Sequence, residues 1–191
     1  MRLEALILAG ALLLAGCSGA APESVSSKAR VMPKSGAVWA RDLANGLGLD
    51  EWSVCAELGS FDCVAEAHRI TLGGVEPTVL GIDEPLPNAS VSAPIAVDRV
   101  ASTACAERFD LDKAGNPIVF GPVLAKDDEA AREAVAETLI RRLVARHPTQ
   151  DDVANLLALR DALEPVSTDV VRDWSVGACV VVATSTEALF Y

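Results

Sequence analysis

The stretch DDEAAREAVAETLIRRLVARHPTQDDVANLL, residues 127–157, decides the fold class of this chain. The apolar residues of its first half recur four positions apart, at Val135, Leu139 and Leu143, and so share one face of a helix. Acidic residues begin this half and basic residues end it, as the helix dipole favours; the basic ones are Arg141, Arg142, Arg146 and His147. We therefore predict a helix over residues 127–147.

The second half of the stretch predicts another helix directly afterwards. Pro148 closes the first helix, because proline cannot continue one. Thr149 follows, and Asp152 lies three residues later, an arrangement much like a capping box. The apolar residues Val153, Leu156, Leu157 and Leu163 are expected to face inward.

Helical spacing of apolar residues extends over most of the chain outside this stretch. It predicts further helices over residues 37–48, 50–58, 60–72, 95–109 and 168–184, with a short extended segment at 118–120. No strand pattern of comparable length occurs, and no internal repeat is visible. The predicted fold is all-α, a compact bundle of about six helices over residues 37–191.

Residues 75–94 interrupt this helical pattern. They hold four prolines with a glycine between them, a density that forbids a long helix or an inner strand. We predict a long irregular loop here. Such loops are often functional, although some only wrap the core, and this one is the best candidate contact for a protein partner.

Five cysteines occur in the chain, and four of them lie in the predicted helical domain: Cys55, Cys63, Cys105 and Cys179. There is no Cys-x-x-Cys, so the spacing favours neither a zinc ribbon nor a thioredoxin-like site. An even number in an oxidising compartment predicts two disulfides, for which three pairings exist. We favour Cys55–Cys63, which flank Gly59 at equal distances, together with Cys105–Cys179, which lie in apolar helical segments.

The start of the chain has the pattern of a secretory signal. Arg2 precedes an almost wholly apolar run, residues 5–16, that is too short to cross a bilayer as a helix. Its end, Leu14-Ala15-Gly16-Cys17, resembles the lipobox of bacterial lipoproteins. The resemblance implies cleavage of residues 1–16, a diacylglyceryl group on the Cys17 sulfur and an acylated new amino terminus.

Residues 17–36 are rich in Ser, Ala, Gly and Pro, and we expect them to form a flexible tether. An ordered arm on the domain surface is the alternative for this segment. Cleavage by the ordinary signal protease near Ala20 and Ala21, or a plain membrane anchor, are the alternatives to lipid attachment. Ser18 follows the cysteine in place of Asp, which by resemblance to the sorting rule of double-membraned bacteria indicates the outer membrane.

The formal net charge of −11 argues against binding to nucleic acid or to anionic headgroups. The predicted contact with the membrane is therefore the lipid anchor alone, and the expected location is the cell envelope, facing the periplasm or the cell surface. Several acyl chains hold a protein at a bilayer far more firmly than one, since each buried methylene contributes about 0.8 kcal/mol.

Few residues offer catalytic or metal-binding chemistry. The chain has two histidines, His68 and His147, and lacks a nucleophile elbow, an HExxH motif and a phosphate-binding glycine loop. Residues 110–116 match a calcium loop at the first, third and sixth positions, but Ala114 stands at the fifth position and Gly121 at the twelfth, where oxygen ligands belong. We predict a plain turn there, and no metal or cofactor.

The last third of the chain suggests a second resemblance. The segments Leu139–Leu156 and Trp174–Tyr191, with Arg146-His147-Pro148-Thr149 in the first, resemble the helical tails of uncharacterised domains in planctomycete-type cytochrome c proteins. This chain has Thr186 where the family has Pro, and it contains no haem motif. The resemblance implies a helical module associated with an envelope electron-transfer or degradative system.

Three functions follow as hypotheses. The first is a non-enzymatic envelope lipoprotein with a protein-binding or structural role. The second, implied by the tail resemblance, is an accessory subunit of a periplasmic redox or degradative complex. The third is a small hydrolase that uses His68 as its base.

Overall fold

The computed structural model describes residues 31–51, 54–85 and 90–191. The chain divides into two units, residues 1–31 and 32–191, and the second is the folded unit considered below. It contains the following elements: α1 (Gly36–Leu47), β1 (Ala56–Glu57), β2 (Phe61–Asp62), the π-helix η2 (Cys63–Ala67), α2 (Ala93–Lys113), α3 (Gly121–Ala125), α4 (Glu129–Leu143), α5 (Gln150–Leu163), α6 (Val170–Ala183) and α7 (Thr186–Leu189). The predicted all-α fold is confirmed.

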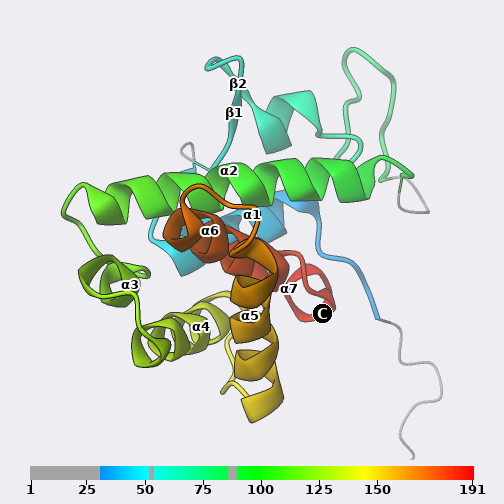
Figure 1. Cartoon of the computed structure of the whole chain (residues 1–191). Helices are drawn as coiled ribbons and strands as arrows, with labels where there is room; N and C mark the ends of the chain where they lie inside the picture. Colours follow the sequence, from blue (N-terminus) through cyan, green and yellow to red (C-terminus); the bar gives the residue numbers. More distant parts are fainter. Residues whose placement is uncertain (1–30, 52–53, 86–89) are drawn as a thin grey trace, which may run out of the picture. The chain divides into compact units, whose positions relative to one another are not determined.

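Helix α2 is the central element of the folded unit. It packs against α1 and α6, while α4 contacts α1, α5 and α6 (Figure 1). The Cys105–Cys179 disulfide joins α2 to α6, with the two Cα atoms 5.9 Å apart. Trp174 is fully buried, and its indole nitrogen donates to the carbonyl of Leu156 at 2.8 Å, which fixes α6 against α5. These contacts form one continuous core.

Short polar side chains begin most of the helices, as helix termini require. Asp128 caps α4, and Thr149 with Asp152 form the predicted capping box at the start of α5. Helix α4 ends at Leu143, and Ala145 has a φ of 57°. The prediction of a helix to residue 147 was therefore too long by one turn, because the left-handed residue breaks it before Pro148.

A buried ion pair fixes the end of α1. Arg108 and Asp112, one turn apart on α2, meet at 2.8 Å with side chains 1% and 0% exposed. The Arg108 guanidinium also donates to the carbonyls of Leu47 and Gly48 at the C-terminus of α1. Those carbonyls have no partner within their own helix, so the guanidinium satisfies acceptors that burial would otherwise leave unpaired.

The same ion pair positions the segment before α3. The Asp112 carboxylate accepts hydrogen bonds from the backbone N–H groups of residues 118, 119 and 120, at 2.5–2.9 Å. This segment is a series of bends and not the predicted extended piece, because three consecutive N–H groups turn toward one carboxylate. Arg108 thus lies within the core, with its charge paired to Asp112.

The region between α1 and α2 differs most from expectation. The predicted helices over residues 50–58 and 60–72 are wrong: a β-hairpin occupies 56–62, and η2 covers only Cys63–Ala67 before a series of turns. Leu58 and Gly59 both have positive φ, 52° and 69°, which no continuing helix accepts. Asp62 is the N-cap of η2, so this short helical segment begins at Cys63, three residues after the predicted start at residue 60.

The two ends of the folded unit lie side by side. The backbone N–H of Lys34 donates to the carbonyl of Leu189, and that of Tyr191 donates to Met32. Residues 32–36 of the predicted tether thus belong to the folded unit, which begins before residue 37. Residues 17–30, with the lipid-attachment residue Cys17, lie outside the described residues, and their prediction stays untested.

Candidate functional site

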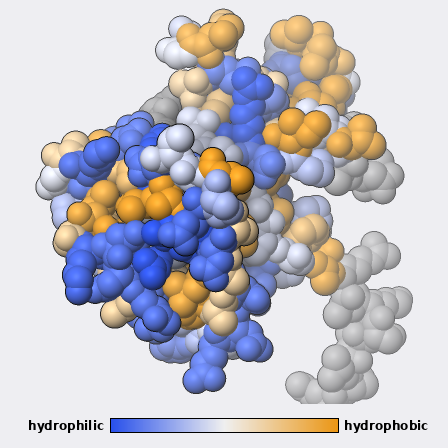
Figure 2. Space-filling view, in the orientation of Figure 1, coloured by the Kyte–Doolittle hydropathy of each residue, from blue (hydrophilic) through white to orange (hydrophobic). Residues whose placement is uncertain are grey.

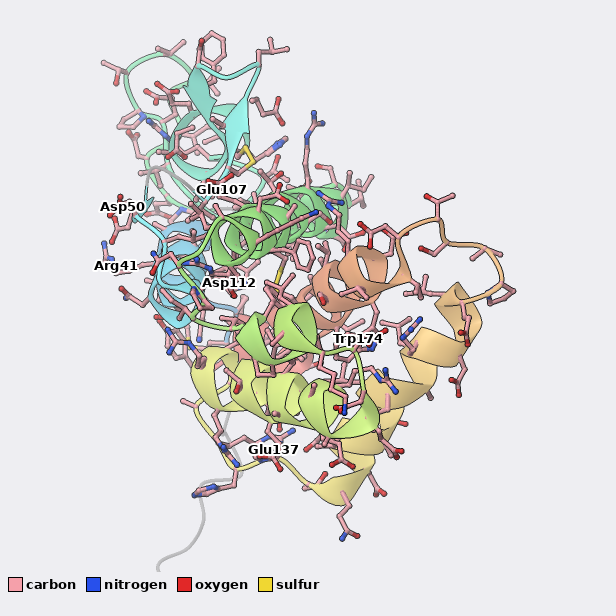
Figure 3. The ribbon with its side chains drawn as sticks, turned by 60° about the vertical axis from the view of Figure 1, so that its left-hand side comes forward. Arg41, Asp50, Glu107, Asp112, Glu137 and Trp174 are labelled. Carbon is pink, nitrogen blue, oxygen red and sulfur yellow. A yellow bond between two sulfur atoms is a disulfide. The ribbon has the colours of Figure 1, made fainter. Side chains whose placement is uncertain are left out.

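Residues 54–85 and 90–98 form a region that we call the acidic cap. It comprises the hairpin, η2, the proline-rich loop and the first turn of α2, and it lies on the side of α2 opposite α4 and α5 (Figures 1 and 3). It holds seven carboxylates and one arginine, a formal charge of −6, and no lysine. The carboxylates belong to Glu57, Asp62, Glu66, Glu76, Asp83, Glu84 and Asp98.

The hairpin of the cap is held by a disulfide. Cys55 and Cys63 are joined, with Cα atoms 5.4 Å apart, so both parts of the predicted cysteine pairing are confirmed. Ala56 pairs with Asp62 and Glu57 with Phe61, so the bridge closes directly behind a two-residue ladder. Because so short a ladder is not stable alone, the covalent bond is one of the contacts that hold the hairpin in place.

Three side chains attach the hairpin to its surroundings. His68 Nε2 lies 2.8 Å from Glu57 Oε1, and the Arg99 guanidinium of α2 lies 3.1 Å from the same oxygen. Glu57 therefore connects β1, the end of η2 and α2. Among the described residues no hydroxyl or thiol is hydrogen-bonded to His68, so the nucleophile that the hydrolase hypothesis needs is not placed beside it.

Several cap carboxylates are already engaged. Glu76 pairs with Arg69 and accepts from the Thr78 hydroxyl, and these contacts keep the pKa of Glu76 below its usual range, the Thr78 hydrogen bond first. The Asp62 carboxylate accepts the first N–H groups of η2. By contrast, the exposed carboxylates Asp83, Glu84 and Asp98 take part in no ion pair or side-chain hydrogen bond within the described residues.

The cap also exposes large apolar side chains. Of the twelve most exposed ones among the described residues, six belong to the cap, and they occupy three places: Leu58 and Phe61 on the hairpin, Val79 and Leu80 on the loop, Val91 and Ile95 at the start of α2. Figure 2 shows apolar groups at the hairpin, the loop and this end of α2, with hydrophilic side chains between them. The sequence indicated the loop as the candidate contact for a partner, and that prediction stays untested. The exposed apolar side chains of the hairpin were not predicted, because its residues were assigned to helices.

A cavity of about 370 Å³ lies between α1 and the cap. Its wall is largely apolar, with Val54 and Leu72 among its residues, and charged side chains such as Arg41 and Arg69 line it as well. Arg41 is engaged with Glu51, and Arg69 with Glu76. This cavity has room for a small side chain or ligand, but both arginines are paired with carboxylates and the Asp62 carboxylate accepts backbone N–H groups of η2, so its charged groups select no particular chemistry.

The other residues that could bind a metal ion or another ligand have structural roles or lie apart from one another. Asp110 is exposed, and Asp112 is committed to Arg108 and to three N–H groups, so residues 110–116 form no calcium loop. His147 lies beyond the end of α4 in the connection to α5. Within residues 31–51, 54–85 and 90–191, no group of three or more His, Cys, Asp or Glu side chains is arranged to hold a metal ion.

Comparison with known proteins gives no guide to function: no family model, curated protein or solved structure matches this chain. The likeness of its last third to cytochrome-associated helical tails therefore stays an expectation. In the part of the chain that the structure describes, none of the helices has both the length and the apolar character needed to cross a bilayer.

Proposed function

We propose that this chain is a lipid-anchored protein of the bacterial envelope, attached through Cys17, whose acidic cap binds another protein. The proposal takes the anchor from the lipobox-like Leu14-Ala15-Gly16-Cys17 and the location from Ser18. It takes the binding role from the cap. The protein acts by holding a partner near the membrane and not by catalysis.

The observation that carries the binding role is the exposure of apolar side chains on the cap. Six of the twelve most exposed large apolar side chains of the described residues lie on this one region, in three pairs, and exposed apolar groups rimmed by polar residues are typical of surfaces that contact a protein or a membrane. Val79 is 81% exposed on the loop, and Leu58 is 91% exposed on the hairpin. Leaving these side chains in water serves no purpose for the stability of the fold, which supports a role in binding.

The anchor is tested in cells of the bacterium that carries the gene. We expect the wild-type protein to incorporate labelled palmitate and to fractionate with the outer membrane, while Cys17→Ser does neither and accumulates as precursor. Ser18→Asp is the matched variant for location: it keeps the palmitate but moves to the inner membrane. Normal processing of Cys17→Ser to a lipid-free product would contradict the proposal and favour ordinary cleavage near Ala20.

The two alternative functions remain predictions. A redox or degradative accessory role depends on the tail resemblance alone. A hydrolase role depends on His68, whose ring nitrogen contacts Glu57. Turnover that is abolished by His68→Ala without loss of thermal stability would support the hydrolase against the binding protein.

A further inference from the structure

We propose that the acidic cap binds a cationic polypeptide segment that carries apolar side chains between its basic residues. This inference rests on the proposed binding function and specifies the chemistry of the partner. It is carried by three observations on the cap: where its apolar side chains are exposed, which carboxylates lie beside them, and which charges are missing.

The exposed apolar residues occupy three separate places and not one continuous patch. Val79 and Leu80, 81% and 60% exposed, lie on the loop. Val91, 98% exposed, lies just before α2, and Ile95, 70% exposed, lies in its first turn. Leu58 adds a third place on the hairpin. A partner that covers all three must itself present several apolar side chains at intervals, as an extended or helical segment does.

Free carboxylates lie beside two of these places. Asp98 is three residues after Ile95 in α2, so the two side chains are neighbours on one helix face. Asp83 and Glu84 follow Leu80 closely in the loop. Since these three carboxylates have no cationic partner within the described residues, a lysine or arginine from outside gains a pairing without breaking one.

The scarcity of basic residues in the cap disfavours acidic partners, neutral partners and anionic membranes. Arg69 is the one arginine in the cap, and Glu76 already pairs with it. An acidic partner would meet like charge at Asp83, Glu84 and Asp98, and a neutral partner would leave these three carboxylates without a cation. A bilayer surface would accept the apolar side chains, but the anionic headgroups of a bacterial membrane would repel the carboxylates around them.

The test uses the full-length protein in its own cells. Val79 and Val91 in the cap are replaced, one at a time, by the photo-crosslinking residue p-benzoylphenylalanine. Val166 and Val181, which are also exposed but lie outside the cap, serve as matched positions. The attached peptides are then sequenced by mass spectrometry. We expect residues 79 and 91 to capture the same polypeptide, through segments with a net positive charge, and residues 166 and 181 to capture it far less.

Charge-reversal variants test whether the free carboxylates of the cap contribute to binding the partner. The protein that carries the photo-crosslinking residue at position 79 or 91 is given three further substitutions together: Asp83→Lys, Glu84→Lys and Asp98→Lys. The matched control reverses three exposed carboxylates in or just after α5: Asp151, Asp161 and Glu164. We expect the cap variant to lose at least about tenfold in crosslinking yield, because like charges across an interface are strongly unfavourable. The control should keep the wild-type yield. Circular dichroism checks that both variants fold.

The other outcomes overturn the proposal in distinguishable ways. Capture of acidic or neutral segments by the cap contradicts the cationic partner but leaves a protein-binding function. Capture of a protein through residues 166 and 181, and not through the cap, contradicts the cap as the binding surface but leaves a protein-binding function. Adducts with phospholipid at residues 79 and 91 identify the bilayer as the occupant. The absence of any protein adduct at all four positions contradicts both this inference and the proposed function.

Discussion

The acidic cap and the rest of the folded unit carry the same formal charge, −6 each, but the charged side chains are distributed differently in the two regions. The helical body, residues 32–51 and 99–191, distributes 18 carboxylates and 12 basic side chains over 113 residues. The cap has seven carboxylates and one arginine in 41 residues. Ion pairs therefore neutralise much of the body, whereas most of the negative charge of the cap faces water.

The two regions also differ in how they are stabilised. Among the described residues, 30 apolar side chains are buried, and the cap contributes five of them: Val54, Cys55, Cys63, Leu72 and Ala96. Each region has one disulfide, but the bridge of the body spans 74 residues and that of the cap spans eight. A region with few buried contacts opens locally at low cost, so we expect the cap to open while the body stays folded.

The largest expected effect comes from the disulfide of the body. On the chain-entropy model, Cys105→Ala with Cys179→Ala removes about 4 kcal/mol from the free energy of unfolding, because the closed loop is long. Urea denaturation followed by circular dichroism measures the loss, and it should appear in the single transition of the whole body. A change below about 1 kcal/mol would show that this bridge contributes little beyond the packing of α2 on α6.

The buried ion pair of the body should give an effect of similar size. Asp112→Asn keeps the shape of the side chain but leaves the Arg108 charge without its partner in the core, which typically costs about 3–5 kcal/mol. The same urea titration measures it. Asp110→Asn, two residues away on an exposed position, is the matched control and should lie within about 0.5 kcal/mol of wild type. Equal effects of the two variants would show that buried Asp112 contributes no more to stability than an exposed carboxylate does.

The disulfide of the cap should act locally. On the same entropy model, Cys55→Ala with Cys63→Ala lowers the free energy of unfolding of the hairpin by roughly 2–3 kcal/mol. This loss is smaller than that of the body disulfide because the closed loop is short. We expect this loss in the hairpin alone. Hydrogen exchange of residues 54–72 should accelerate, while exchange in α2 after Ala101 and in α6 stays as in wild type. Faster exchange in α6 would mean that cap and body unfold as one unit.

Acid should affect the body through Asp152. The hydrogen bonds and charge of Arg146, followed by the bonds to Thr149, hold the pKa of Asp152 well below its usual range. Because the pKa is lower in the folded state than in the unfolded one, this stabilisation is present above about pH 4 and is lost as the pH falls further.

Melting temperatures measured between pH 6 and pH 2 test this dependence. Asp152→Asn should lower the melting temperature at pH 6 and flatten its decline at acidic pH. The neighbouring Asp151→Asn, which changes an exposed carboxylate, should keep the wild-type profile. A profile of Asp152→Asn parallel to that of wild type would show that the Arg146 contact contributes nothing to the acid sensitivity.

The smallest effect concerns the attachment of the cap to α2. Arg99 is 61% exposed, so removing its contact by Glu57→Gln should change the free energy of unfolding by no more than about 1 kcal/mol. Local exchange in the hairpin should still increase, because Glu57 also contacts His68. Unchanged exchange of residues 54–62 would show that the disulfide alone holds the hairpin.

The sequence predicted the body well because its signals are local. The capping box at Thr149 and Asp152 lies within four residues, and the apolar period of α4 recurs every four residues from Val135 to Leu143. The pairing of Cys105 with Cys179 was predicted from two helices that each bury the cysteine. Such patterns decide the structure of a segment without reference to distant residues.

The cap and the buried ion pair could not be predicted in the same way. The turn at Leu58 places a leucine at positive φ, which no local preference favours, and a two-residue ladder is too short to show a strand pattern. Arg108 is buried because carbonyls of α1, some 60 residues earlier in the chain, need a donor. A guanidinium with such distant partners is indistinguishable in the sequence from one on the surface.

Native-state hydrogen exchange of the full-length protein tests the division into cap and body most directly. Amides of residues 54–72 should open with a free energy well below that of global unfolding, while those around Cys105 and Cys179 should exchange only through global unfolding. Equal opening free energies in both regions, with the same dependence on denaturant, would show one cooperative structure and contradict an adaptable cap on a rigid body.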